Sequence, residues 1–164
     1  MSTPQAIVLT ISDSAARGDR ADLSGPAARG ELERLGCAVV SVTVVPDDVN
    51  MIREKLLEHS DSGVIDLIVT TGGTGLAPRD VTPEATQQVI EKFIPGLPEL
   101  IRMEGLKSNP RAALSRAVAG LRKKTLILNL PGSVRGVQES LAAVAPILGH
   151  ALEVASGNTI RCGG

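Results

Sequence analysis

Apolar residues along the chain fall into two kinds of pattern. Short runs rich in Val, Ile and Leu at residues 6–11, 37–45, 65–69 and 125–130 predict four strands that are buried on both faces. Between these runs, apolar residues recur at the three- and four-residue spacing of amphipathic helices. Strands that alternate with helices in this way are typical of a three-layer α/β/α sandwich with a mainly parallel sheet.

The helices of the first half have recognisable start and stop residues. Ser24 is interpreted as the N-cap, and Gly36 as the C-terminal stop, of the helix that follows the first strand. Residues 49–59 carry apolar positions on one face and predict a second helix. Thr82, followed by a proline, is interpreted as the N-cap of a third helix that runs to about Phe93.

Breaks divide the second half of the chain. Residues 95–96 (Pro-Gly) end one helix, residues 97–107 predict another, and a final region of one or two helices begins near residue 134. Residues 112–121 fit no single pattern; one interpretation is a short helix and an edge strand, which would give the sheet an antiparallel edge. No linker or repeat interrupts this order, so residues 1–164 are interpreted as a single domain.

Composition narrows the class of partner. The formal net charge is −1 and Phe93 is the only aromatic residue, so neither nucleic acid nor an anionic membrane is indicated as a partner. No apolar run is long enough to cross a bilayer, and no signal peptide is visible. Cys37 and Cys162 lie far apart, which argues against a disulfide or a cysteine metal site. We therefore expect a protein of the reducing cytoplasm.

Each predicted strand is followed by a loop of small and polar residues. These loops are Ser-Asp-Ser at 12–14, Pro-Asp-Asp at 46–48, Thr-Thr-Gly-Gly-Thr-Gly at 70–75 and Pro-Gly-Ser at 131–133. In open α/β sheets the carboxyl ends of the strands gather at one edge, and ligands bind there. We therefore expect the four loops to form one binding site.

The loop after the third strand has the strongest local signal. Its sequence, TTGGTGLAPRDVTPEAT over residues 70–86, places several glycines just before a predicted helix. Glycines permit positive φ and close approach of a ligand to the backbone, and successive N–H groups can bind an anion. A phosphate or a polar heterocycle is therefore indicated, although a tight strand-to-helix connector would look similar. The loop matches neither the Walker pattern nor the dinucleotide fingerprint.

Two acidic residues, Asp47 and Asp80, lie in loops that we expect to converge. Mg²⁺ prefers oxygen ligands and is commonly held by one or two carboxylates together with substrate phosphates. Each acid also has a purely structural interpretation. Asp47 or Asp48 would serve as an N-cap, and Asp80 would complement the dipole of the following helix.

The four loops contain no His, Cys or Lys, and their one arginine is Arg79. Catalysis by a Ser-His-Asp triad is therefore not indicated. Phosphoryl or nucleotidyl transfer tolerates this lack, because an attacking phosphate is already anionic and the protein need only align groups and neutralise charge.

Taken together, the motifs resemble a known family. TTGGTGLAPRDVTPEAT, with ISDS near the start, VVPDD in the middle, and ALSRAVAG and LNLPGS late, is similar to molybdopterin adenylyltransferases over about residues 6–151. The resemblance implies an α/β/α sandwich that is usually a homotrimer. It also implies that Mg²⁺ and ATP are used to join AMP to the terminal phosphate of molybdopterin, with release of pyrophosphate. The product would pass to a separate molybdate-insertion protein.

The resemblance also implies roles for individual residues. Asp47 and Asp80 match the two important acids, which we assign to catalysis and Mg²⁺ binding, and Ser115 matches a serine associated with ligand handling. The matched binding positions are Thr71, Gly72, Gly73, Thr74 and Gly75 in the glycine loop, and Ser12, Asp13, Gly132 and Ser133 elsewhere in the pocket. Two alternatives share this fold: a non-catalytic pterin-binding or scaffolding module, and a nucleotide pyrophosphatase that needs no pterin.

Overall fold

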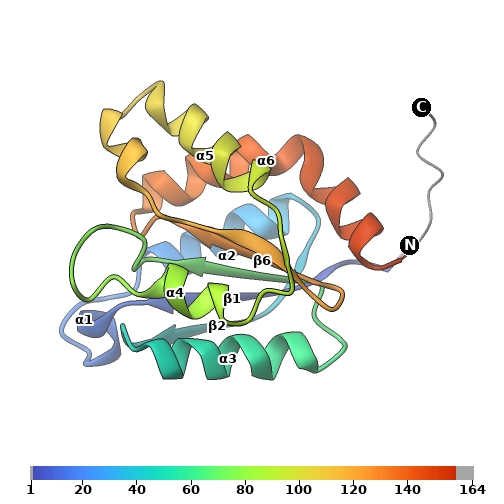
Figure 1. The fold of residues 1–164 in the computed structure, drawn as a ribbon, viewed down its shortest axis with the longest axis horizontal. Helices are drawn as coiled ribbons and strands as arrows, with labels where there is room; N and C mark the ends of the chain where they lie inside the picture. The colour runs from blue at the N-terminus through green and yellow to red at the C-terminus, as the bar shows by residue number, and fades with distance from the viewer. Residues whose placement is uncertain (1, 158–164) are drawn as a thin grey trace.

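The computed structural model describes residues 2–157, in which a six-stranded sheet lies between two layers of helices (Figure 1). The strand order is β2-β1-β3-β6-β5-β4, with β1, β2, β3 and β6 parallel and β5 antiparallel to both β6 and β4. The mainly parallel sheet with an antiparallel edge is thereby confirmed. The strands are β1 (Gln5–Ile11), β2 (Ala38–Val45), β3 (Leu67–Thr71), β4 (Lys92–Phe93), β5 (Ala119–Arg122) and β6 (Thr125–Leu130).

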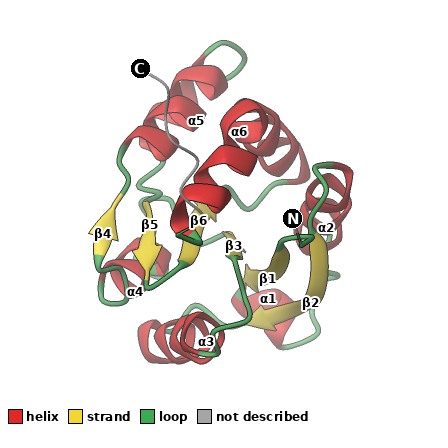
Figure 2. Ribbon diagram, turned by 90° about the vertical axis from the view of Figure 1, so that its right-hand side faces the viewer, coloured by secondary structure: helices red, strands yellow, loops and turns green. Residues whose placement is uncertain are grey.

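Helices cover both faces of the sheet (Figure 2). One apolar cluster joins the sheet to α2, α5 and α6, and a second joins the opposite face to α3 and α4. The alternation of side chains along a strand produces this division, because Val8 of β1 belongs to the first cluster and Leu9 to the second. The helices are α1 (Asp13–Ala16), α2 (Ser24–Arg34), α3 (Val49–Asp61), α4 (Thr82–Gln87), α5 (Gly96–Leu106), the 3-10 helix η1 (Pro110–Leu114) and α6 (Val134–Ala155).

The prediction that a helix runs from Thr82 to about Phe93 is wrong. The helix ends at Gln87, and Lys92–Phe93 forms the edge strand β4. Backbone hydrogen bonds to β5 explain the change, because Glu91 N donates to Leu121 O at 2.8 Å. Pairing with a neighbouring strand here overrides the local helical pattern.

The N-caps predicted at Ser24 and Thr82 are also wrong. Ser24 lies inside α2, and the carboxylate of Asp22 accepts the hydrogen bond from Gly25 N at 2.9 Å instead. Thr82 is the first residue of α4, and its hydroxyl donates to Gly72 O at 2.9 Å. Thr82 therefore does not cap α4; its hydroxyl joins α4 to the glycine loop by a hydrogen bond.

The second half of the chain follows the predicted order of elements in part. The ambiguous region 112–121 contains the end of η1 and the start of β5, and the final helical region is the single helix α6, which contains Pro146. No helix in the described part of the chain is long and apolar enough to cross a membrane. Cys37 is a buried free thiol, whereas Cys162 lies outside the described residues.

Candidate functional site

The loops that follow the four parallel strands meet at one edge of the sheet, on the left in Figure 1. Hydrogen bonds join them directly. Ser12 N donates to Val45 O at 2.9 Å, and the hydroxyl of Thr71 donates to Pro131 O at 2.7 Å. The expectation that these loops converge is therefore confirmed by their contacts.

A cavity of about 410 Å³ opens between these loops, and we call it the acid cavity. Asp47 and Asp80 both line it, although they come from different loops. Carboxylates from two separate strand ends therefore face one space. The other sequence-predicted residues that line the acid cavity are Ser12, Thr71, Gly72, Gly73, Gly132 and Ser133.

The glycines of the glycine loop lie against both acids and place no side chain beside them. Gly72 and Gly73 have φ values of 101° and 65°, a region that glycine tolerates and other residues rarely adopt. A Cβ on Gly73 would collide with the hydroxyl of Thr82 and lie 3.1 Å from Asp47 Oδ1, and one on Gly75 would lie 2.8 Å from Asp80 Oδ2. These glycines therefore keep the space beside both carboxylates open.

The two adjacent aspartates at the end of β2 do different things. Asp48 is exposed and caps α3, because its Oδ1 accepts from Met51 N at 2.9 Å. Asp47 points to the cavity, and its Oδ2 accepts from Asp13 N at 2.8 Å. Burial raises the pKa of the Asp47 carboxyl, and the nearby charges of Asp13 and Asp80 act in the same direction.

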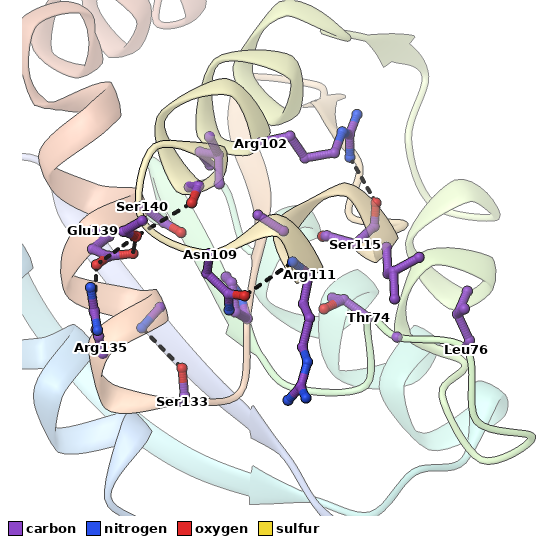
Figure 3. A pocket seen from close by; sticks show the side chains of 18 residues that line it. Thr74, Leu76, Arg102, Asn109, Arg111, Ser115, Ser133, Arg135, Glu139 and Ser140 are labelled. Atoms are coloured by element: carbon purple, nitrogen blue, oxygen red, sulfur yellow. Dashed lines mark hydrogen bonds and ion pairs between the residues drawn. The ribbon is translucent and has the colours of Figure 1, made fainter.

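A second cavity of about 530 Å³ adjoins the first, and we call it the Ser115 cavity (Figure 3). It lies between the glycine loop, α5, η1 and the start of α6. Of the sequence-predicted residues, Thr74, Gly75 and Ser115 line this cavity rather than the first. Ser133 lines both cavities, so the two spaces share a wall. The predicted site is therefore divided into two compartments.

Asp13 is the one predicted binding residue that lines neither cavity. Its carboxylate accepts two hydrogen bonds from Arg79, at 2.9 and 3.0 Å, and one from Asp47 N at 3.0 Å. The hydrogen bond from Arg79 lowers the pKa of the Asp13 carboxyl. Asp13 therefore contacts the residues of the acid cavity from outside.

Arg116 was not predicted, although it holds the wall between the two cavities. Its guanidinium donates to Gly75 O and to Asp80 O, both at 2.7 Å, and pairs with Glu84. Its backbone N donates to Thr74 O at 2.9 Å. Arg116 follows no strand of the sheet edge, so only its position beside Ser115 in the family-like motif could have drawn attention to it.

Arg20 and Asp22, which line the acid cavity, were also missed. They lie in the segment between α1 and α2, where no strand end marks them. The Asp22 carboxylate accepts from the hydroxyl of Thr10 at 2.8 Å as well as from α2. A carboxylate just before a predicted helix start was the signal available for Asp22.

The donors in the acid cavity fit a magnesium ion that is shared with a substrate. The described residues contain no group of three or more His, Cys, Asp or Glu side chains that could hold a metal by themselves. Asp47 and Asp80 supply carboxylate oxygens, the ligands that Mg²⁺ prefers. The bare glycine backbone beside them leaves room for phosphate oxygens as further ligands.

Comparisons with known proteins identify the family to which the chain is similar. Residues 7–150 match the family model described as "Probable molybdopterin binding domain". The chain is 43 % identical over 156 residues to the molybdopterin adenylyltransferase of Helicobacter pylori, with 94 % of this chain and 89 % of that protein covered. It is also 43 % identical over 148 residues to the molybdenum cofactor synthesis protein cinnamon of Drosophila melanogaster, covering 90 % of this chain but only 25 % of that protein.

Solved structures give the same result. The molybdopterin biosynthesis enzyme MoaB of Thermus thermophilus superposes with a TM-score of 0.88 at 50 % identity, covering 93 % of this chain and 96 % of that one. The resemblance inferred from the sequence motifs is confirmed. The chain belongs to the molybdopterin-binding family that these relatives represent.

Proposed function

We propose that the protein is a molybdopterin adenylyltransferase, which transfers AMP from ATP to the terminal phosphate of molybdopterin and releases pyrophosphate. Family membership and the names of the similar proteins support this activity. The observation that carries the proposal is the placement of Asp47 and Asp80 in one cavity beside a bare glycine loop. This arrangement suits a triphosphate that shares a divalent ion with the protein.

The two compartments suit two substrates. The triphosphate of ATP would lie in the acid cavity, where Asp47 and Asp80 would hold Mg²⁺, an ion that offsets the charge of the phosphates and of departing pyrophosphate. Molybdopterin would lie in the Ser115 cavity, with its phosphate directed to the shared wall. Among the residues that the structure describes, no His, Cys or Lys lines either cavity, which agrees with a reaction in which the anionic nucleophile needs no base.

The glycine loop would bind phosphate oxygens through its backbone. Gly72 N is occupied, since it donates to Leu130 O at 3.1 Å. The N–H groups of Gly73, Thr74 and Gly75 have no hydrogen-bond partner among the described residues and border both cavities. These three donors can neutralise charge that develops between the attacking phosphate and the α-phosphorus. Ser115 would add a side-chain hydrogen bond to the bound pterin substrate.

Release of pyrophosphate tests the proposal. We expect the purified protein to release pyrophosphate from ATP only when Mg²⁺ and molybdopterin are both present. Binding of molybdopterin without pyrophosphate release would instead indicate a pterin-binding or scaffolding module. Release without any pterin would indicate a nucleotide pyrophosphatase. Either of these two results would overturn the proposed activity.

We further propose a cytoplasmic homotrimer that hands its product to a molybdate-insertion protein. The longer Drosophila relative, of which this chain covers 25 %, supports a functional link to a second domain. Several large apolar side chains are more than half exposed, among them Phe93 at 58 % and Met103 at 65 %, and an assembly would cover such surface. Light scattering after size-exclusion chromatography would test the trimer.

A further inference from the structure

An exposed ion pair bridges two of the strand-end loops. Arg79 donates through Nε to Asp13 Oδ2 at 2.9 Å and through Nη2 to Asp13 Oδ1 at 3.0 Å. Asp13 begins α1 after β1, whereas Arg79 directly precedes Asp80 in the loop after β3. Several ion pairs of the described residues join side chains within one helix turn. This pair, like those of Arg116 and Arg122, instead joins distant parts of the chain, and its residues are 66 positions apart. The bidentate contact therefore fixes one loop against the other.

Asp13 is also joined to Asp47 in both directions. Asp13 N donates to Asp47 Oδ2 at 2.8 Å, and Asp47 N donates to Asp13 Oδ1 at 3.0 Å. Asp13, which lies outside the cavity, thus contacts Asp47 directly and contacts Arg79, the residue next to Asp80.

We propose that Asp13 and Arg79 act together as positioning residues that set the distance between the Asp47 and Asp80 carboxylates. This inference rests on the proposed function, because it takes those two carboxylates as the ligands of a divalent ion. Neither Asp13 nor Arg79 lines the cavity, so neither is assigned a contact with substrate. Groups that orient metal ligands from outside typically change metal affinity or activity by about 10- to 100-fold when they are replaced.

The exposure of the ion pair indicates that it positions the two acids and contributes little to the stability of the fold. The side chain of Arg79 is 67 % exposed and that of Asp13 is 25 % exposed. Exposed ion pairs contribute little to stability. Arg79 also neutralises the negative charge of Asp13. Without Arg79, that charge would lie uncompensated beside the Asp47 carboxylate. Loss of the pair should therefore disturb the two acids much more than the fold.

A double-mutant cycle with Asp13→Asn, Arg79→Gln and the double variant tests the proposal. Asparagine can still accept from Asp47 N, so each single change removes mainly the bidentate contact. The probe is Mn²⁺ with an ATP analogue that carries a methylene group between the α- and β-phosphates. Binding of Mn²⁺ is followed by electron paramagnetic resonance. We expect each single variant to bind Mn²⁺ about 10-fold more weakly, with the double variant no weaker than the singles.

Asp19→Asn is the matched control. It removes an exposed aspartate–arginine pair of the neighbouring loop, Arg17 Nε to Asp19 Oδ2 at 2.8 Å, which contacts neither acid. This control should bind Mn²⁺ like wild type, and all variants should keep a Tm within about 2 °C of wild type.

Three results would overturn the positioning role. These are wild-type affinity in both single variants, additive losses in the double variant, and weak binding that follows a large fall in Tm. Absence of Mn²⁺ binding in the wild-type protein would overturn the metal assignment of the proposed function as well. Pyrophosphate release by the wild-type protein, measured separately, shows whether that activity survives when the positioning role does not.

Discussion

The acid cavity and the Ser115 cavity share a wall but are built from different parts of the fold. The walls of the acid cavity come from loops that directly follow β1, β2, β3 and β6 and from residues 20–24 at the start of α2. The Ser115 cavity is closed by α5, η1 and the first turns of α6 (Figure 3). Among the described residues, the charged side chains that line the Ser115 cavity are three arginines and one glutamate, whereas those that line the acid cavity are three aspartates, Asp22, Asp47 and Asp80, and one arginine, Arg20.

The two compartments depend on the fold in different ways. The carboxyl ends of parallel strands lie at one edge of the sheet. Small and acidic residues in the loops that follow these strands therefore come together there as a ligand-binding site. The helical wall of the Ser115 cavity has no such requirement, because its shape depends on how α5 and α6 pack. We therefore expect substitutions in the acid cavity to affect chemistry, and those in the Ser115 cavity to affect binding of one substrate.

The largest expected effect comes from Asp80→Asn in the acid cavity. Asparagine can still accept from Ala77 N, which now donates to Asp80 Oδ2 at 2.9 Å, so the loop should keep its shape. Loss of the charge should lower kcat/KM for pyrophosphate release by roughly 100- to 1,000-fold. The matched control is Asp48→Asn. It changes the exposed N-cap of α3, which lies next to Asp47, and should leave activity unchanged. Near-normal turnover by Asp80→Asn would contradict a metal-binding role.

Arg116→Gln should have the second largest effect, because Arg116 holds the wall that both compartments share. Without the guanidinium, the carbonyls of Gly75 and Asp80 lose their hydrogen bonds. We expect activity to fall by about 10- to 100-fold, with KM raised for both substrates. Glu84→Gln removes only the ion pair of Arg116 and serves as the control, with a much smaller effect expected. If only one substrate were affected, the shared-wall interpretation would be wrong.

Sequence patterns were sufficient for the parallel part of the fold. Runs of mainly apolar residues predicted β1, β3 and β6, which are covered on both faces, and also β2, although this edge strand is only partly buried. They failed at Lys92–Phe93, where pairing with β5 decides the conformation and the local pattern still looks helical. The N-cap prediction at Thr82 failed for a similar reason, since its hydroxyl donates to Gly72 O in the glycine loop.

The site residues that follow strands could be predicted from the sequence, whereas those positioned by contacts between distant segments could not. Asp47 and Asp80 could be placed near each other from strand ends alone, and Ser115 was reached only through the family resemblance. Arg116 was missed because its contacts with residues 74–80 depend on where the chain returns to the sheet edge. The role inferred for Asp13 likewise depends on Arg79, a partner that its sequence position does not reveal.

Ser115→Ala should produce a smaller change that is confined to the second compartment. The hydroxyl of Ser115 accepts only a long hydrogen bond from Ala117 N, at 3.3 Å, so its removal should leave the backbone in place. Loss of one neutral hydrogen bond to the pterin substrate should raise KM for molybdopterin by roughly 3- to 10-fold. Binding of the ATP analogue, measured by calorimetry, is the internal control and should not change. Weaker nucleotide binding would show that the two compartments do not separate the substrates as proposed.

The smallest expected effect is a gain in stability from Asp47→Asn. Burial raises the pKa of Asp47, so the folded state binds its proton more tightly than the unfolded chain does. The ionised carboxylate therefore destabilises the fold at neutral pH, and this penalty disappears as the pH falls through the raised pKa. Thermal unfolding at pH 7 should show a Tm higher than wild type by on the order of 1–2 °C, with a smaller difference in acid.

Asp47→Asn should lose activity while it gains stability, which would show that the charge in the acid cavity serves the reaction and not the fold. Mg²⁺ with the ATP analogue should raise the Tm of wild type but not that of Asp47→Asn, since a ligand stabilises only the form that binds it. A lower Tm for the variant at pH 7 without ligand would mean that Asp47 stabilises the loops through its bond to Asp13 N. In that case the Asp47 carboxylate would contribute to the stability of the fold as well as to the reaction. The expectation that substitutions in the acid cavity affect mainly chemistry would then be wrong.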